Sequence, residues 1–388
     1  MALTHIPLQA ISEADLRLLI EGTAAESLTI EYKRDTYGAD DRSKAEFLAD
    51  VSSLANTRGG DLIIGMDAPA GVPTALVPFS GDADAERLRF EQMARSGLEP
   101  RIPNLQTRAV PVRSGFAIIV RVPQSYAAPH RIIFGGRNRF VARSSAGKYD
   151  PNVAELRTMF AFGPELAERM RAFRFDRIVR MLAGASVVPL LDSCLLVLHI
   201  VPFSHFDMRP RFSLTEVDHS LFAPIGTQQA ADWRVNFDGF LTLSNPNQGG
   251  HRAYVQVFRT GAVEAVASSL ARSDGGIHIG QICHDIVDYT RRFTVDLEQC
   301  GVEPPLTVMV SLLGVRGRLL APEFSVWDQP GQVADRDELH LTEAVLEEIH
   351  NSNPLCAKAL RPMLDHLANA AGLIASPFFG QDGNYALR

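Results

Sequence analysis

The chain has 388 residues, of which 46% are hydrophobic and 21% are charged, the balance of an ordinary globular protein. This composition excludes a disordered, collagen-like or disulfide-framework protein, and the length suggests two or three domains. The longest apolar runs, near residues 200 and 310, are well below the ~20 residues of a transmembrane helix. With no signal peptide and four scattered cysteines, we expect a cytoplasmic protein without a membrane partner.

The charge distribution is uneven although the net charge is only −7. Residues 101–149 contain nine basic residues, eight of them arginines, and no acidic residue. Such a stretch creates a positive field that suits a phosphate backbone, and arginine can bind phosphate through two parallel hydrogen bonds. The alternative is an ordinary solvated surface whose acidic partners come from elsewhere in the fold.

The first 160 residues read as alternating helices and strands. Capping residues and hydrophobic periodicity predict, in chain order, a helix over 12–22, a strand over 27–33, a helix over 43–57, a strand over 61–66 and a helix over 82–97. Two hairpins then follow, one turning at 113–115 and one at Gly135-Gly136, and a further helix begins near Asn152. This order predicts a mixed sheet with flanking helices.

The second half of the chain has a different character. Residues 164–183 are helical and basic, which suggests a connector. Strands are predicted after it over 193–203, 238–244, 253–261 and 306–315, and helices over 279–299 and 353–373. We therefore expect an α+β protein with a first domain over 1–162, a helical connector over 163–185 and a second α+β domain over 186–388.

One segment of the second half carries a possible metal pattern. Read as a helix, 340–350 (HLTEAVLEEIH) places two histidines and two glutamates near one face. Glutamates at this spacing more often form a solvated helix face than a metal site.

The most suggestive chemistry lies in the strand at 27–33. Side chains alternate along a strand, so Glu31 and Lys33 should share one face while Ile30 and Tyr32 share the other. Many metal-dependent nucleases place carboxylates and a lysine in this way, to hold a divalent ion and a phosphate. Glu26 before the strand and Asp67 after the next strand could reach the same face. The alternative is a solvated strand carrying a Glu–Lys pair.

The arrangement of motifs resembles the Schlafen-type AlbA domain over roughly residues 12–160. The most specific piece is SLANTRGGDLIIGMD, which is similar to the family's A-[FN]-A-N-T-x-G-G-x-L-x-x-G-V-x-D segment. Leu54 replaces the usual aromatic residue, and Asp67 is the single acid after the second strand. The later RFVARS is similar to the family's aromatic-x-x-R strand, with Arg143 at the arginine.

The resemblance implies a nucleic-acid-binding domain of bacterial type. In Schlafen ribonucleases three carboxylates bind the metal that cuts structured RNA such as tRNA. The matching positions here are Glu26, Glu31 and Asp67, which would hold Mg²⁺ or Mn²⁺, with Lys33 positioning the phosphate. The residues expected to contact the nucleic-acid backbone are Arg58, Arg131, Arg137, Arg139 and Arg143. Because Schlafen ribonucleases use two AlbA-like lobes, the second could come from a homodimer or from the C-terminal half.

We therefore expect a nucleic-acid-binding protein, with RNA favoured over DNA, that could act as a metal-dependent endoribonuclease. The alternatives are a non-catalytic DNA- or RNA-binding regulator and a nucleotide-sensing protein. Residues 56–60 (NTRGG) bear on the choice, because their backbone amides could cradle a phosphate. The simpler interpretation is that Gly59 and Gly60 make the tight turn from helix to strand.

Overall fold

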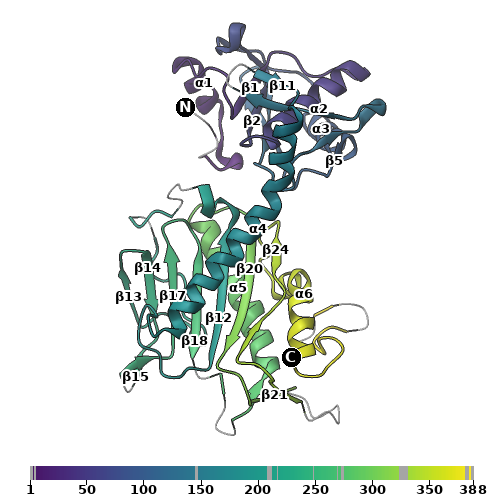
Figure 1. The fold of residues 1–388 in the computed structure, drawn as a ribbon. Helices are drawn as coiled ribbons and strands as arrows, with labels where there is room; N and C mark the ends of the chain where they lie inside the picture. The colour runs from purple at the N-terminus through teal and green to yellow at the C-terminus, as the bar shows by residue number, and fades with distance from the viewer. Residues whose placement is uncertain are drawn as a thin grey trace. The chain divides into compact units, whose positions relative to one another are not determined.

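The computed structural model describes residues 3, 6–144, 147–207, 212–215, 217–247, 249–268, 270–271, 275–322, 331–380 and 384–385. The chain divides into two compact units, Met1–Ala167 and Glu168–Arg388, and each combines helices with β-sheet (Figure 1). The α+β class is therefore confirmed. The boundary between the units falls inside helix α4 (Val153–Leu182).

The first unit is built from short strands and three further α-helices. The helices are α1 (Glu13–Glu21), α2 (Asp41–Ala55) and α3 (Ala83–Gly97), with 3-10 turns at Leu8–Ala10, Pro69–Gly71 and Phe134–Gly136. The strands are β1 (Ile30–Lys33), β2 (Gly60–Ile64), β3 (Met66–Asp67), β4 (Ala75–Leu76), β5 (Leu98–Glu99), β6 (Gln106–Val112), β7 (Gly115–Val122), β8 (Arg131–Ile132), β9 (Arg139–Phe140), β10 (Ala142–Ser144) and β11 (Gly147–Tyr149). Polar side chains cap the starts of these helices: Ser12 forms a capping box, and Asp40 and Asp82 accept backbone N–H groups.

The central sheet of this unit has the strand order β1-β2-β7-β6. β1 and β2 run parallel, with Glu31 opposite Leu62, while β7 is antiparallel to both β2 and β6. The sheet is therefore mixed, as expected. One face packs on α2 and α3 around Phe47, Leu54 and Phe90. The other face packs on α1, around Leu16 and Leu19.

The second unit contains one large sheet with helices on both sides. Its helices are the end of α4, α5 (Ile279–Gln299) and α6 (Asn353–Ala370), with a 3-10 turn at Phe203–Asp207. Its strands are β12 (Leu195–Pro202), β13 (Asp232–Val235), β14 (Gly239–Leu243), β15 (Pro246–Asn247), β16 (Gly250–His251), β17 (Ala253–Phe258), β18 (Val263–Ser268), β19 (Ile277–His278), β20 (Leu306–Leu313), β21 (Leu319–Ala321), β22 (Gln332–Val333), β23 (Glu338–His340) and β24 (Ala344–Leu346).

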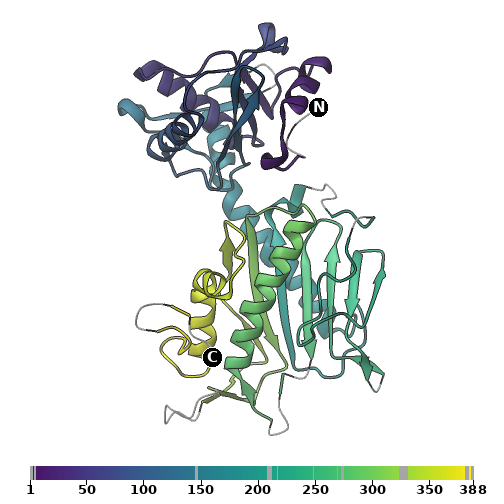
Figure 2. The ribbon, with the colours of Figure 1, turned by 180° about the vertical axis from the view of Figure 1, so that it is seen from behind.

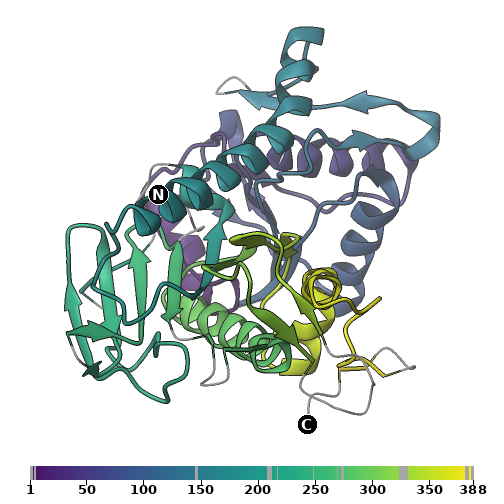
Figure 3. The same cartoon turned by 60° about the horizontal axis from the view of Figure 1, so that its bottom comes forward.

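The large sheet has the order β13-β14-β17-β18-β12-β20-β23, with β24 also paired to β20, and all these pairs are antiparallel. Helices α5 and α6 lie side by side and cover one face of this sheet, as Figures 2 and 3 show. Helix α4 crosses the opposite face (Figure 1), where Ile178 and Met181 pack against Val197 and Leu241.

A buried ion pair fastens α4 to this sheet. Arg177 on α4 donates two hydrogen bonds to Glu264 on β18, at 2.7 and 2.8 Å. Glu264 is fully buried and also accepts the hydroxyl of Tyr254 at 2.9 Å and lies 3.2 Å from Nε2 of His199. A carboxylate buried without such partners would be strongly unfavourable, so these contacts fix where α4 sits on the sheet.

The metal pattern read at 340–350 is wrong in its secondary structure. Residues Glu338–His340 and Ala344–Leu346 form strands β23 and β24, which pair with β20. The glutamates and histidines of this segment therefore do not line one helix face. Pairing with the buried strand β20 outweighs the local helical spacing.

Candidate functional site

Strand β1 places Glu31 and Lys33 on the α2 side of the sheet. Ile30 and Tyr32 point to the other side, where they join the core beneath α1. The alternation predicted for this strand is confirmed. Lys33 donates a hydrogen bond from Nζ to Oε1 of Glu31 at 2.6 Å. The opposite charges expected on this face are therefore in direct contact.

The Glu31–Lys33 pair belongs to a larger group of charges, here called the buried ion cluster. Its members are Glu31, Lys33, Glu46, Asp50, Arg143 and Lys148, three acids and three bases. Arg143 on β10 donates from Nη2 to Oε2 of Glu31, and its side chain is only 2% exposed. Lys148 on β11 contacts Glu46 at 2.5 Å and Asp50 at 2.6 Å. The cluster is neutral as a whole and joins β1, α2, β10 and β11.

Asp50 is the fully buried member of the cluster, and sequence reasoning missed it. It lies in the middle of α2, where Oδ1 meets Lys148 and Oδ2 meets Lys33 at 3.5 Å. The hydroxyl of Tyr37 also donates to Oδ2 at 2.6 Å. One signal in the sequence could have identified Asp50. It is an acid between Ala49 and Val51 on the buried face of an amphipathic helix, where residues are normally apolar.

The acids of the cluster respond differently to burial. Burial alone would raise the pKa of Glu31, but the hydrogen bond and charge of Lys33, together with Arg143, lower it. For Asp50, burial outweighs the two lysines and raises the pKa. Burial also raises the pKa of Glu26, and the nearby charge of Glu31 adds to that effect.

The three acids expected to hold a metal are not assembled for that purpose. Glu26 accepts the backbone N–H of Tyr32 at 3.0 Å, and both oxygens of Glu31 are engaged by Lys33 and Arg143. Asp67 ends β3, where its carbonyl accepts the N–H of Thr74. Across the part of the chain that the structure describes, no three His, Cys, Asp or Glu side chains form a group able to hold a metal ion. The binding of Mg²⁺ or Mn²⁺ expected at these three acids stays a prediction.

The basic run over 101–149 largely meets acids from elsewhere in the unit. Five of its nine members form ion pairs: Arg121 with Asp61, Arg131 with Glu99, Arg139 with Asp150, Arg143 with Glu31, and Lys148 with Asp50. The remaining four make no ion pair with any described residue. The acidic partners expected by the alternative interpretation are thus present for the five paired residues, although Arg143 is buried and not on a solvated surface.

The five arginines expected at a nucleic acid fall into two groups. Arg143 is buried, and Arg131 and Arg139 are already paired with carboxylates. Arg58 and Arg137 are exposed, and neither forms an ion pair with the residues described here. Arg137 lies beside the start of α2, 3.5 Å from the carbonyl of Asp41. Only these two of the five present an unneutralised guanidinium.

The NTRGG segment has a structural role. Asn56 donates from Nδ2 to the carbonyls of His130 and Val141, at 3.1 and 2.9 Å, and its Oδ1 accepts the N–H of His130 at 2.7 Å. Gly60 has φ 143°, and a Cβ there would lie 2.2 Å from the carbonyl oxygen of Thr29. The glycine therefore permits the tight approach of β2 to the segment before β1.

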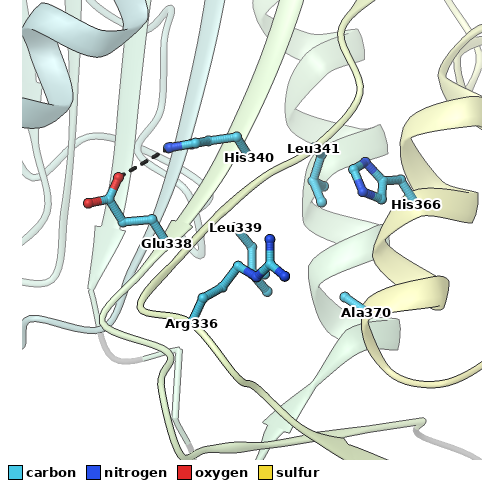
Figure 4. A pocket seen from close by; sticks show the side chains of 7 residues that line it. All are labelled: Arg336, Glu338, Leu339, His340, Leu341, His366 and Ala370. Carbon is cyan, nitrogen blue, oxygen red and sulfur yellow. Dashed lines mark ion pairs between the residues drawn. The ribbon is translucent and has the colours of Figure 1, made fainter.

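The second unit contains a small pocket between the β23 region and α6 (Figure 4). Glu338 turns toward His340, whose Nε2 it meets at 3.1 Å, and Nδ1 of His340 lies 3.0 Å from the hydroxyl of Ser311. Burial lowers the pKa of His340, and the charge of Arg174 lowers it further. On the other side, Nδ1 of His366 accepts the N–H of Thr342 at 3.0 Å. Two of its lining residues, His340 and Leu341, belong to the segment 340–350 singled out in the sequence, but the helical pattern expected there did not predict this pocket.

The fold and the buried ion cluster define a mixed α/β domain, and the comparison with known families identifies it. Residues 26–152 match the family described as Schlafen, AlbA_2. The first unit therefore contains a Schlafen AlbA_2 domain, and the resemblance found in the sequence is confirmed over that range. No protein of curated function matches the chain. No helix among the described residues is long and apolar enough to cross a membrane.

Two solved structures are similar to part of the chain. One is the N-terminal domain of an ATP-dependent DNA helicase RecG-related protein from Nitrosomonas europaea, with 23% identity and a TM-score of 0.26, covering 35% of this chain and 90% of that one. The other is a protein from Corynebacterium diphtheriae, with 15% identity and a TM-score of 0.26. That match covers 37% of this chain, which spans only 30% of the second protein's length.

Proposed function

We propose that the first unit binds nucleic acid through its backbone phosphates, as a module that does not cleave it. The supporting observation is the contrast between neutralised and free charges. Glu31, one of the three acids expected at a nuclease centre, is held by Lys33 and Arg143, whereas Arg58 and Arg137 are exposed without a described acidic partner. Arginine is well suited to this task because its guanidinium binds phosphate through paired hydrogen bonds.

The surroundings of Arg137 add a second element of support. Here Arg42 is exposed on the first turn of α2, and the ammonium of Lys44 lies 5.7 Å from the ring centre of Phe134. Arg137 contacts the same helix start. Cations beside an aromatic ring are typical of surfaces that bind single-stranded nucleic acid, where the ring stacks on a base. The acids Asp40 and Asp41 at the same helix start reduce the local positive charge, so we expect moderate affinity.

A matched pair of variants tests this proposal. Arg137→Gln and Arg139→Gln remove the same charge two residues apart on the exposed surface, but only Arg139 is paired, with Asp150 at 2.7 Å. We expect Arg137→Gln to weaken binding more and to reduce the slope of log affinity against log salt by about 1. Fluorescence anisotropy with labelled RNA and DNA of one sequence measures both quantities. Salt-independent binding, or no binding by the parent protein, would contradict the proposal.

Metal-dependent cleavage of structured RNA is the second candidate. One observation favours it: Glu26 and Glu31 lie near enough for the charge of one to raise the pKa of the other. Incubating the protein with tRNA, with and without Mn²⁺, beside Glu31→Gln, decides between the two functions. Under the binding function no fragments form. Fragments that need Mn²⁺ and disappear in Glu31→Gln, under conditions where circular dichroism shows the variant folded like its parent, would establish the nuclease.

A further inference from the structure

Strand β13 is an open edge of the large sheet in the second unit. Among the described residues it pairs with β14 alone, on one side. All four of its residues are exposed, including Trp233 at 42% and Val235 at 50%, whereas every residue of its neighbour β14 is buried. An exposed apolar edge strand is a ready template for pairing with another strand, so natural proteins usually protect it or use it.

The hydrogen-bonding groups on this edge can be assigned from the ladder. The N–H of Asn236 donates to the carbonyl of Gly239 at 2.9 Å, so Asn236 directs its backbone groups toward β14. In an antiparallel pair every second residue does the same. Asp232 and Arg234 therefore direct their backbone groups toward β14. Trp233 and Val235 direct theirs outward. The outward N–H of Trp233 is held only by the neighbouring carboxylate of Asp232, at 2.8 Å.

The side chains of the edge carry charges that complement one another. Asp232 and Arg234 lie on one face of the strand, and Trp233 and Val235 lie on the other. Arg234 makes no ion pair with any described residue. The ring of Trp233 stacks on His219 at a centroid distance of 3.5 Å, which holds its orientation. The edge thus offers a positive and a negative side chain two residues apart.

Only one twofold register joins two such edges favourably. Two copies of β13 pair antiparallel only where outward-facing residues lie opposite one another. The twofold axis can therefore pass at Trp233, at Arg234 or at Val235. A dyad at Arg234 would set two arginines face to face, and one at Val235 would place Arg234 opposite Asn236. The dyad at Trp233 instead sets each Asp232 opposite Arg234 of the second copy, an attractive cross-strand pair.

We propose that a second copy of this chain pairs with β13 in antiparallel fashion, about a twofold axis at Trp233. In the dimer the N–H of each Trp233 donates to the Trp233 carbonyl of the other copy. The Asp232 carboxylate gives up its hydrogen bond with that N–H and pairs instead with the Arg234 guanidinium of the other copy. Such an interface uses the same surface on both copies and closes on itself. This dimer does not depend on nucleic-acid binding.

Sedimentation velocity of the full chain over a concentration series, without nucleic acid, tests this proposal. We expect a reversible monomer–dimer equilibrium. Asp232→Arg and Arg234→Asp should each be monomeric, because each places like charges across the dyad. An equimolar mixture of the two variants should dimerise again, since the arginine introduced in one chain then faces the aspartate introduced in the other.

Restored dimerisation in the mixture also shows that both variants are folded. Val345→Asp provides the matched control, because this exposed residue lies on β24, away from β13 in the same sheet, and its dimerisation should equal that of the parent. A parent protein that stays monomeric at every concentration would overturn the proposal. So would a dimer that survives both single variants, or a mixture that remains monomeric.

Discussion

Glu31 and Arg143 lie 112 positions apart in the chain and form a buried ion pair between β1 and β10. The guanidinium is 2% exposed and the carboxylate 8%, so neither charge can be solvated if the other is removed. Breaking such a pair from one side leaves an uncompensated charge in the interior, which is more costly than losing the attraction alone. The residue expected to be the centre of a metal site thus anchors the fold.

Glu31→Gln should therefore destabilise the first unit. We expect the free energy of unfolding to fall by about 3 to 5 kcal/mol, because the buried Arg143 loses its charged partner and Lys33 keeps only the more distant Asp50. Urea unfolding followed by far-UV circular dichroism measures the change. Arg17→Gln is the control, since Arg17 is exposed and its pair with Glu13 should contribute little. A Glu31→Gln protein as stable as its parent would show that the pair is dispensable.

Asn56 gives a second prediction, which separates structure from phosphate binding. Asn56→Ala removes three hydrogen bonds to the backbone of two separate segments and leaves buried peptide groups unpaired. At about 1 to 3 kcal/mol for each unpaired group, we expect a loss of several kcal/mol in unfolding free energy. Nucleic-acid affinity, corrected for the folded fraction, should stay the same. An affinity that falls while stability does not would instead favour a phosphate-binding role for this segment.

The Arg177–Glu264 pair predicts how the second unit responds to acid. Burial would raise the pKa of Glu264, but the hydrogen bonds from Arg177, followed by His199, lower it to about 2 from an ordinary value of 4.5. A lowered pKa stabilises the folded state above pH ~4.5, and this contribution is lost as the pH falls toward 2. A shift of this size corresponds to about 3 kcal/mol.

Tryptophan fluorescence can follow this loss selectively, because Trp233 lies on β13 of the second unit and residues 1–167 contain no tryptophan. The denaturant midpoint should decrease as the pH falls from about 4.5 toward 2. In Glu264→Gln the midpoint should be lower at neutral pH and should depend less on pH in that window. An unchanged pH dependence in the variant would show that another acid is responsible.

Local patterns in the sequence predicted the elements, while the contacts between distant elements could not be read from it. The alternation of IEYK placed Glu31 and Lys33 on one face, and helical periodicity located α2 and α5. The pairing of Glu31 with Arg143 depends on how β10 packs against α2, which no local pattern encodes. The basic run looked unneutralised because its acidic partners, such as Asp61 and Glu99, lie outside it.

The last prediction concerns Asp50, which holds two lysines from different strands. Asp50→Asn keeps the shape of the side chain and an acceptor for Tyr37, but it removes the charge that Lys33 and Lys148 share. Tyr37→Phe removes only the hydrogen bond. Because burial holds the pKa of Asp50 above its ordinary value, its charge does not add stability to the fold. We therefore expect Asp50→Asn to lower the unfolding free energy by no more than Tyr37→Phe, which should lower it by about 1 to 2 kcal/mol. If Asp50→Asn is the more strongly destabilised of the two in urea, the charge and not the hydrogen bond fixes Asp50 in the cluster.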